Sequence, residues 1–187
     1  MISALGEGIT QSLLPCSWIL LVPAATLGLA TRRVAVLGTF AGAAVLTAWI
    51  AVAGWVIPPL WLAGVTLLVG GLLWWRLGPG SGAAAMIGVG SAWAWQPCVG
   101  PELGVALTTA QYDPPAAFGG LALFLVGVVG VGLGIGVAGS FLLDRLGKEP
   151  LTKAGAVVVA VLGLTMIVGL YPKIASTLAQ WSTALWG

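Results

Sequence analysis

The chain has 187 residues, of which 59% are hydrophobic and only 6% are charged, and it contains no histidine. Soluble domains usually carry about 25% charged residues, so this composition excludes a water-soluble enzyme and a disordered segment. It also excludes a nucleic-acid-binding protein, because a net charge of +2 provides no basic face for phosphates. We therefore expect a polytopic membrane protein whose surface contacts the lipid bilayer.

Prolines, glycines and charged residues divide the chain into six apolar runs. A spanning helix needs about 20 mainly apolar residues, so six spans leave no room for a soluble domain. The runs are continuous and do not alternate at every second residue, which favours helices over barrel strands. The first ten residues contain Glu7 but no Lys or Arg, so the first run is expected to be a retained span and not a signal peptide. The expected spans are residues 9–30, 34–56, 60–75, 83–110, 116–143 and 151–171.

Positive charge predicts the orientation of these spans. Six of the seven cations lie in or beside the loops between spans 1 and 2, 3 and 4, and 5 and 6, namely Arg32, Arg33, Arg76, Arg145, Lys148 and Lys153. Only Lys173 lies on the other side, together with Glu7 and Asp113. By the positive-inside rule, the three cationic loops face the cytoplasm and both termini lie outside.

Aromatic residues and the end of the chain fit the same orientation. Trp55 and Trp61 flank the expected outer turn, and Trp74 and Trp75 flank the inner turn, where membrane proteins concentrate aromatic side chains. Apolar residues recur at helical spacing in residues 173–186. This tail is expected to form a short helix on the outer membrane interface.

Glycine is the other residue in excess, with 29 of 187 positions against a usual frequency of about 7%. Pairs of small residues four positions apart let helix backbones approach closely. Such pairs occur at Gly38/Gly42, Gly130/Gly134 and Gly132/Gly136. Tight packing within one bundle is the favoured interpretation, and a helix interface that slides during a conformational change is the alternative.

Two cysteines are the candidate working residues of the chain. Cys16 follows Pro15 and Cys98 follows Pro97, each inside an expected span. A proline inside a helix removes a backbone hydrogen bond, and a membrane tolerates this only where protein or water satisfies the freed carbonyl. We therefore expect helices 1 and 4 to be broken at Pro-Cys, with each thiol placed at an accessible cavity.

The positions of the cysteines also predict an internal symmetry. Cys16 lies 16 residues before Arg32, and Cys98 lies 15 residues before Asp113. Spans 1–3 and 4–6 cross in opposite directions, because three is an odd number. This arrangement is typical of inverted-topology repeats, whose working site lies near the middle of the membrane. The two expected repeats are residues 1–76 and 83–171.

The thiols allow a small set of reactions. If Cys16 and Cys98 meet, they can form one disulfide, and otherwise any disulfide is intermolecular. Exchange proceeds by thiolate attack through a mixed disulfide, and a half-helix N-terminus pointing at sulfur would lower the thiol pKa. Glu102 either relays a proton to the leaving thiolate or lines a water-filled vestibule. Three tryptophans near the cysteines are expected to pack in the bundle, with lining or gating a cavity as the alternative: Trp18, Trp93 and Trp95.

At these two motifs the sequence resembles the CcdA family, which is similar to the membrane domain of DsbD. The segment Gln96-Pro97-Cys98-Val99-Gly100-Pro101 is similar to the family's Pro-Cys-x-Gly-Pro signature in the fourth span. Pro15-Cys16 is similar to the Ser-Pro-Cys-x-x-Pro signature of the first span, but Leu14 replaces the serine and Ile19 replaces the second proline. Glu102 stands where the family usually has an apolar residue.

The resemblance implies transfer of reducing equivalents across the inner membrane of a prokaryote. Cytoplasmic thioredoxin would reduce the pair by attacking Cys16, whose disulfide partner would be Cys98. The pair would then reduce a thioredoxin-like protein outside, which serves cytochrome c maturation or disulfide repair. Pro15, Pro97 and Pro101, with Gly100 in support, would be flexible breaks that expose the thiols to either side. The chain has no cofactor motif, so neither a cofactor nor a metal is expected.

Two other functions are open. The first is a membrane transporter for a small solute, a thiol compound or a soft metal, although two cysteines without histidine make a poor dedicated metal site. The second is a non-catalytic scaffold subunit in which both cysteines merely pack.

Overall fold

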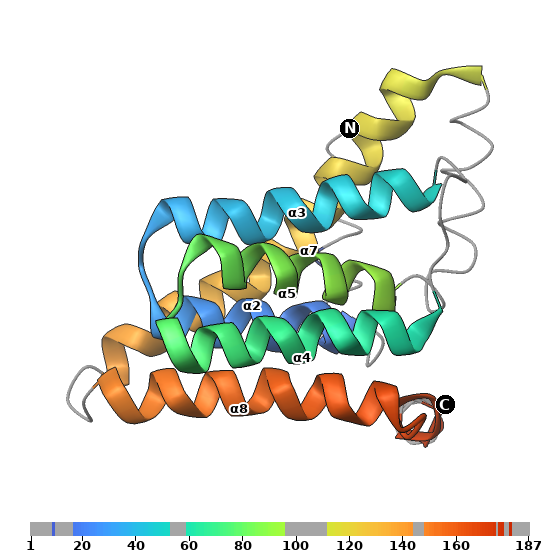
Figure 1. The fold of residues 1–187 in the computed structure, drawn as a ribbon. Helices are drawn as coiled ribbons and strands as arrows, with labels where there is room; N and C mark the ends of the chain where they lie inside the picture. The colour runs from blue at the N-terminus through green and yellow to red at the C-terminus, as the bar shows by residue number, and fades with distance from the viewer. Residues whose placement is uncertain are drawn as a thin grey trace.

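The computed structural model describes residue 9 and residues 17–52, 59–95, 112–143, 148–174, 176–177 and 180. In this part of the chain the regular secondary structure is helical and contains no strand. Six helices pack into one bundle (Figure 1): α2 (Trp18–Ala30), α3 (Val34–Val52), α4 (Leu60–Leu77), α5 (Ser81–Trp95), α7 (Pro114–Leu143) and α8 (Lys148–Ile167). The all-α class predicted from composition is therefore confirmed.

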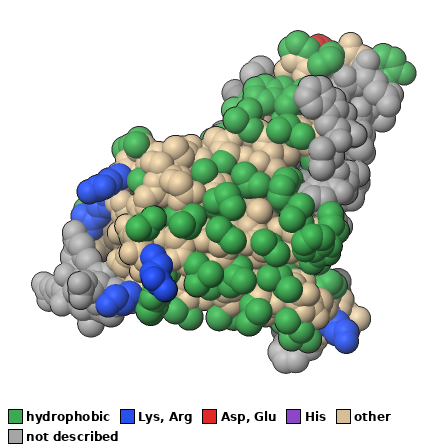
Figure 2. Space-filling model, viewed as in Figure 1, with side chains coloured by type: hydrophobic (Ala, Val, Ile, Leu, Met, Phe, Trp, Pro, Cys, Tyr) green, Lys and Arg blue, Asp and Glu red, His purple; other side chains and the backbone are tan. Residues whose placement is uncertain are grey.

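Three of the described helices are long and apolar enough to cross a membrane. The qualifying segments are Val34–Ala51, Leu60–Leu77 and Pro114–Phe141, and two shorter apolar helices, Trp18–Ala30 and Thr152–Ile167, accompany them. Hydrophobic side chains also cover much of the outer surface of the bundle (Figure 2). The chain thus has the features of a helical membrane protein, with three described helices, and not six, that meet the length and hydropathy of a full span.

Several predicted boundaries agree with the structure because charges and prolines end the apolar runs. α3 begins at Val34, directly after Arg33, and α4 begins at Leu60, directly after Pro59. α4 continues past Arg76, and its C-cap is Gly78 with φ 84°. A positive φ is rare for residues with a side chain, whereas glycine adopts it without steric cost.

The last span differs from the prediction at both ends. Lys148 and Glu149 belong to the first turn of α8 and not to a loop. Pro150 is tolerated there, because N–H groups in the first turn have no partner within the helix. α8 ends at Ile167 rather than near Tyr171, since Gly169 takes a φ of 73°. The chain then resumes a helical conformation at residues 171–174, running across the axis of α8 (Figure 1).

Charge is distributed unevenly between the two ends of the bundle. Figure 2 shows Lys and Arg gathered mainly at one end. This end contains the turn from α2 to α3 with Arg32 and Arg33, the last turn of α4 with Arg76, and the beginning of α8 with Lys153. We call it the cationic end. Lys173 follows α8 and lies at the other end.

Arg32 joins elements that are far apart in the sequence. Its Nε donates a hydrogen bond to Ser140 Oγ at 2.9 Å, and its guanidinium carbon lies 3.8 Å from the ring centroid of Phe141. Ser140 Oγ in turn donates to the carbonyl of Val137 at 2.7 Å. The turn after α2 is thereby fixed to the last residues of α7 at the cationic end.

The most extensive helix contacts are those of α4 with α8, α2 with α7, α3 with α5, and α4 with α5. α2 and α7 run parallel, because a Cβ built on Gly132 would approach Ala24 at 2.8 Å while one on Gly139 would approach Leu29 at 2.9 Å. Between them, a Cβ on Gly136 would collide with the carbonyl of Ala25. At Gly132 and Gly136 an added Cβ would meet the backbone of α2, so glycine allows the two backbones to touch.

α4 and α8 run antiparallel and also meet through glycine. A Cβ on Gly64 would lie 2.7 Å from the carbonyl oxygen of Gly163, and a Cβ on Gly163 would lie 2.6 Å from the carbonyl oxygen of Gly64. Further along, Gly71 faces Ala156 and Ala160. α3 and α5 meet at Gly88, whose Cβ would lie 2.5 Å from the carbonyl oxygen of Phe40.

Other glycines of the same spacing have no such neighbour. In the described part of the chain, Gly38 and Gly42 of α3, and Gly130 and Gly134 of α7, have no atom within 4 Å of a built Cβ outside their own helix. The interpretation that all three glycine pairs serve packing within the bundle is therefore wrong for two of them and right for Gly132/Gly136.

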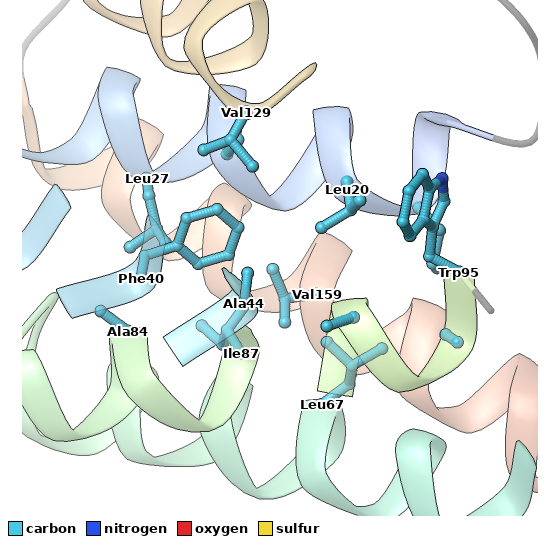
Figure 3. Packing of buried hydrophobic residues seen from close by; sticks show 14 of the residues in the cluster. Leu20, Leu27, Phe40, Ala44, Leu67, Ala84, Ile87, Trp95, Val129 and Val159 are labelled. Carbon is cyan, nitrogen blue, oxygen red and sulfur yellow. The ribbon is translucent and has the colours of Figure 1, made fainter. Parts of the chain in front are cut away.

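A continuous hydrophobic core fills the space between the helices. Phe40 of α3 is fully buried and reaches toward Leu27 of α2 and Ile87 of α5 (Figure 3). Val129 and Val159 bring α7 and α8 into the same cluster. The core therefore unites helices from both halves of the chain.

Trp74 does not occupy the interfacial position that the sequence suggested. It is 1% exposed, and Gly155 of α8 makes room for its ring. Its indole N–H has no hydrogen-bond partner among the described residues. Trp75 and Trp61 are half exposed, as expected for an aromatic belt. Trp55 lies outside the described residues.

Candidate functional site

Every residue that the sequence assigned to the site lies outside the described residues. The set comprises both cysteines, their prolines and two neighbours: Pro15, Cys16, Pro97, Cys98, Gly100, Pro101 and Glu102. The breaks expected at Pro-Cys, the meeting of the two thiols and the role of Glu102 therefore stay predictions. The structure does describe the helix that follows Cys16 and the helix that precedes Cys98.

α2 and α5 lead from the cationic end toward the two cysteines. α2 begins at Trp18 with Ser17 as its N-cap, so the helix starts two residues after Cys16. α5 is described up to Trp95, three residues before Cys98. Their 13 and 15 residues correspond to about 20 and 22 Å along the helix axes. The two segments thus extend a similar distance from the same end.

The start of α2, which follows Cys16, and the end of α5, which precedes Cys98, are firmly packed. The two helices are in contact, and Leu20 of α2 and Trp95 of α5 belong to one buried cluster (Figure 3). Trp95 is 2% exposed, and its ring centroid lies 5.6 Å from that of Phe124 in α7. These ends of α2 and α5 therefore form a packed base together with α7.

The three tryptophans near the cysteines have different surroundings. Trp95 packs in the core, and Trp93 is partly buried against it, as the favoured interpretation predicted. Trp18 is 49% exposed and lines a cavity. This cavity lies between α2 and α8, and a role of Trp18 in lining or gating the cavity expected at the cysteines stays a prediction.

Two buried hydroxyl groups near this region were not singled out from the sequence. Ser17 is the N-cap of α2 and is almost fully buried. Ser91 lies one turn before Trp95 and is also buried, and its Oγ has no hydrogen-bond partner within the residues that the structure describes. A serine among small residues of an apolar helix carries no sequence signal of burial, so only the packing shows where these hydroxyls lie.

The cavity beside Trp18 has a volume of about 390 Å³. Its walls are residues of α2 and α8, and the segment after α8 closes one end: Trp18, Ile19, Val22, Val157, Val158, Val161, Leu162, Thr165, Tyr171 and Ile174. We call it the α2–α8 groove. None of these side chains is charged, so the groove favours an apolar occupant.

The described end of α2 that follows Cys16 and the described end of α5 that precedes Cys98 thus share one packed region of the bundle. Comparison with protein-family models, curated proteins and solved structures finds no match to this chain.

Proposed function

We propose that this chain transfers reducing equivalents across the cytoplasmic membrane by thiol–disulfide exchange through Cys16 and Cys98. The observation that carries the proposal is the matched pair α2 and α5. These helices rise from the same end, contact each other and come within two and three residues of the cysteines. Such an arrangement favours two thiols that meet rather than two that pack separately.

The reaction needs no cofactor. A cytoplasmic thioredoxin dithiol attacks Cys16 of the Cys16–Cys98 disulfide, forms a mixed disulfide, and leaves as an oxidised disulfide. Two electrons and two protons then reside on the Cys16 and Cys98 thiols. The same pair next reduces the disulfide of a thioredoxin-like protein on the opposite side and returns to its oxidised state. Membership in the CcdA family, based on the two Pro-Cys motifs, is part of this proposal.

The proposal includes six spans arranged as two inverted repeats, 1–76 and 83–171. In two related repeats, spans 1, 2 and 3 correspond to spans 4, 5 and 6. The contact of spans 1 and 5 then corresponds to the contact of spans 4 and 2. These two contacts, α2 with α7 and α3 with α5, are both among the most extensive in the bundle. The contact of spans 3 and 6 converts into itself, and α4 and α8 meet through the reciprocal pair Gly64 and Gly163. These pairings support the symmetry.

The orientation in this proposal puts the cationic end in the cytoplasm and both termini outside. It is supported by Arg32, Arg33, Arg76 and Lys153 at one end of the described bundle and by Lys173 at the other. Pro15, Pro97 and Pro101 then act as breaks that let the two sides reach the thiols in turn.

The test is to trap the mixed disulfide. The Cys98→Ser variant in membrane vesicles is mixed with a thioredoxin that lacks its resolving cysteine, and we expect a covalent adduct with Cys16 that dithiothreitol releases. The matched controls are Cys16→Ser, which reports whether attack falls on Cys98, and the double serine variant, which forms no adduct. Absence of an adduct with both single variants would refute the proposal. Solute uptake retained by the double serine variant would favour a transporter.

A further inference from the structure

The α2–α8 groove faces the space that lipid occupies in a membrane. Three valines of α8 form its outer wall, and Val161 is 51% exposed. A cavity lined by apolar side chains excludes water, so hydrocarbon is the medium that fills it in a bilayer. The location of the helices in a membrane is the only premise that the groove shares with the proposed function.

The shape of the groove fits an elongated apolar occupant. Its lining on α8 runs from Val157 to Thr165, which is about 12 Å along the helix. The cavity of about 390 Å³ along that length accommodates an extended acyl chain.

The polar groups of the wall argue against a polar solute. Thr165 Oγ1 already donates to the carbonyl of Leu162 at 2.7 Å, and the other lining residues on α2 and α8 are apolar. Small-molecule sites usually add a few placed polar groups to an apolar pocket in order to fix the ligand. Here polarity is concentrated at one end, where Tyr171 closes the groove.

Charge at that end identifies the headgroup. Lys173 is exposed and lies in the sequence between the lining residues Tyr171 and Ile174. It lies away from the cationic end, so it faces the leaflet at the other end of the bundle. An ammonium group at a membrane surface attracts anionic headgroups, and tyrosine is favoured at the same depth.

We propose that the α2–α8 groove binds one acyl chain of an anionic phospholipid, whose phosphate lies at Lys173. The chain runs along α8 and packs against Trp18, two residues after Cys16 in the sequence. The lipid thereby seals the side of the bundle next to the first cysteine motif.

Native mass spectrometry of the full chain tests this site. The protein is exchanged in detergent with phosphatidylglycerol or phosphatidylcholine, and the lipid retained after release from the micelle is counted. We expect one retained phosphatidylglycerol and at least several-fold less phosphatidylcholine. No retained phosphatidylglycerol, or equal retention of both lipids, overturns the proposal.

Variants distinguish the groove from the rest of the lipid-facing surface. Val161→Trp fills the groove and should lower retention about tenfold, whereas Leu164→Trp is the matched control because Leu164 is also 51% exposed on α8 but does not line the groove. Equal retention by both variants contradicts the proposal.

Lys173→Gln, at an exposed site that leaves the core intact, should lower phosphatidylglycerol retention about fivefold. This variant decides between the outcomes if Val161→Trp does not fold. Retention should be unchanged when both cysteines are serine, so this result is independent of the proposed function.

Discussion

The two faces of α7 use glycine in opposite ways. On one face, Gly132 and Gly136 lie against α2 so closely that an added methyl group would meet its backbone. On the other face, Gly130 and Gly134 have the same spacing but no neighbour within 4 Å of a built Cβ. Identical residues at identical spacing thus fix one contact and leave another surface open. The spacing of glycines predicts where a backbone approach is allowed, and the surrounding helices decide where it occurs.

The largest effect is expected from Gly136→Val. Its side chain would collide with the carbonyl of Ala25, and backbone cannot move aside as a flexible side chain does. We expect a loss of about 3 kcal/mol in the free energy of unfolding, measured by SDS titration of the detergent-solubilised protein. Stability equal to that of the wild type would show that α2 and α7 are not in contact as described.

Gly163→Ala extends the comparison to α4 and α8. The new methyl group would lie 2.6 Å from the carbonyl oxygen of Gly64 and 2.7 Å from the backbone nitrogen of Leu68. We expect a loss of about 2 kcal/mol by the same titration. Gly82→Ala is the control, because nothing lies within 4 Å of a Cβ at that position.

Arg32→Ala tests the contact between the turn after α2 and the last residues of α7. The variant removes the hydrogen bond to Ser140 and the contact with the ring of Phe141. Because Arg32 is exposed, we expect a loss of only about 1 kcal/mol. Arg33→Ala removes the same charge, but the described hydrogen bonds of Arg33 are made by its backbone N–H and carbonyl, so the stability of this variant should stay close to the wild-type value.

The smallest effect is expected from Gly134→Ala on the open face of α7. The methyl group meets nothing outside the helix, and alanine restricts the unfolded chain more than glycine does. We expect a gain of about 0.5 kcal/mol. A clear loss would mean that the open face is covered by a partner in the membrane, and crosslinking would then show a dimer.

The sequence predicted the helical class and several boundaries because the physical signals are local. Arg33 and Pro59 directly precede the described helices α3 and α4. The end of α8 was wrong by four residues, since Tyr171 continues the apolar pattern and nothing in that pattern requires Gly169 to adopt a positive φ. The burial of Trp74 was also missed, because it depends on the space left by Gly155, which lies 81 positions later in the sequence.

The candidate site was predicted from motif chemistry alone. Two Pro-Cys pairs in an almost uncharged chain are conspicuous in any sequence, whereas the α2–α8 groove is not. Its walls combine residues near positions 20 and 160 that look like ordinary lipid-facing valines and leucines. The cavity forms where the surfaces of α2 and α8 do not meet, so the sequence of neither helix predicts it alone.

The parallel contact of α2 with α7 has a consequence for biosynthesis. Arg32 and its partner Ser140 are 108 residues apart, and ribosomes add about 5–20 residues per second. About 5 to 20 seconds of synthesis therefore separate α2 from its partner helix α7. During that interval the side of α2 that later contacts Gly132 and Gly136 is without this partner.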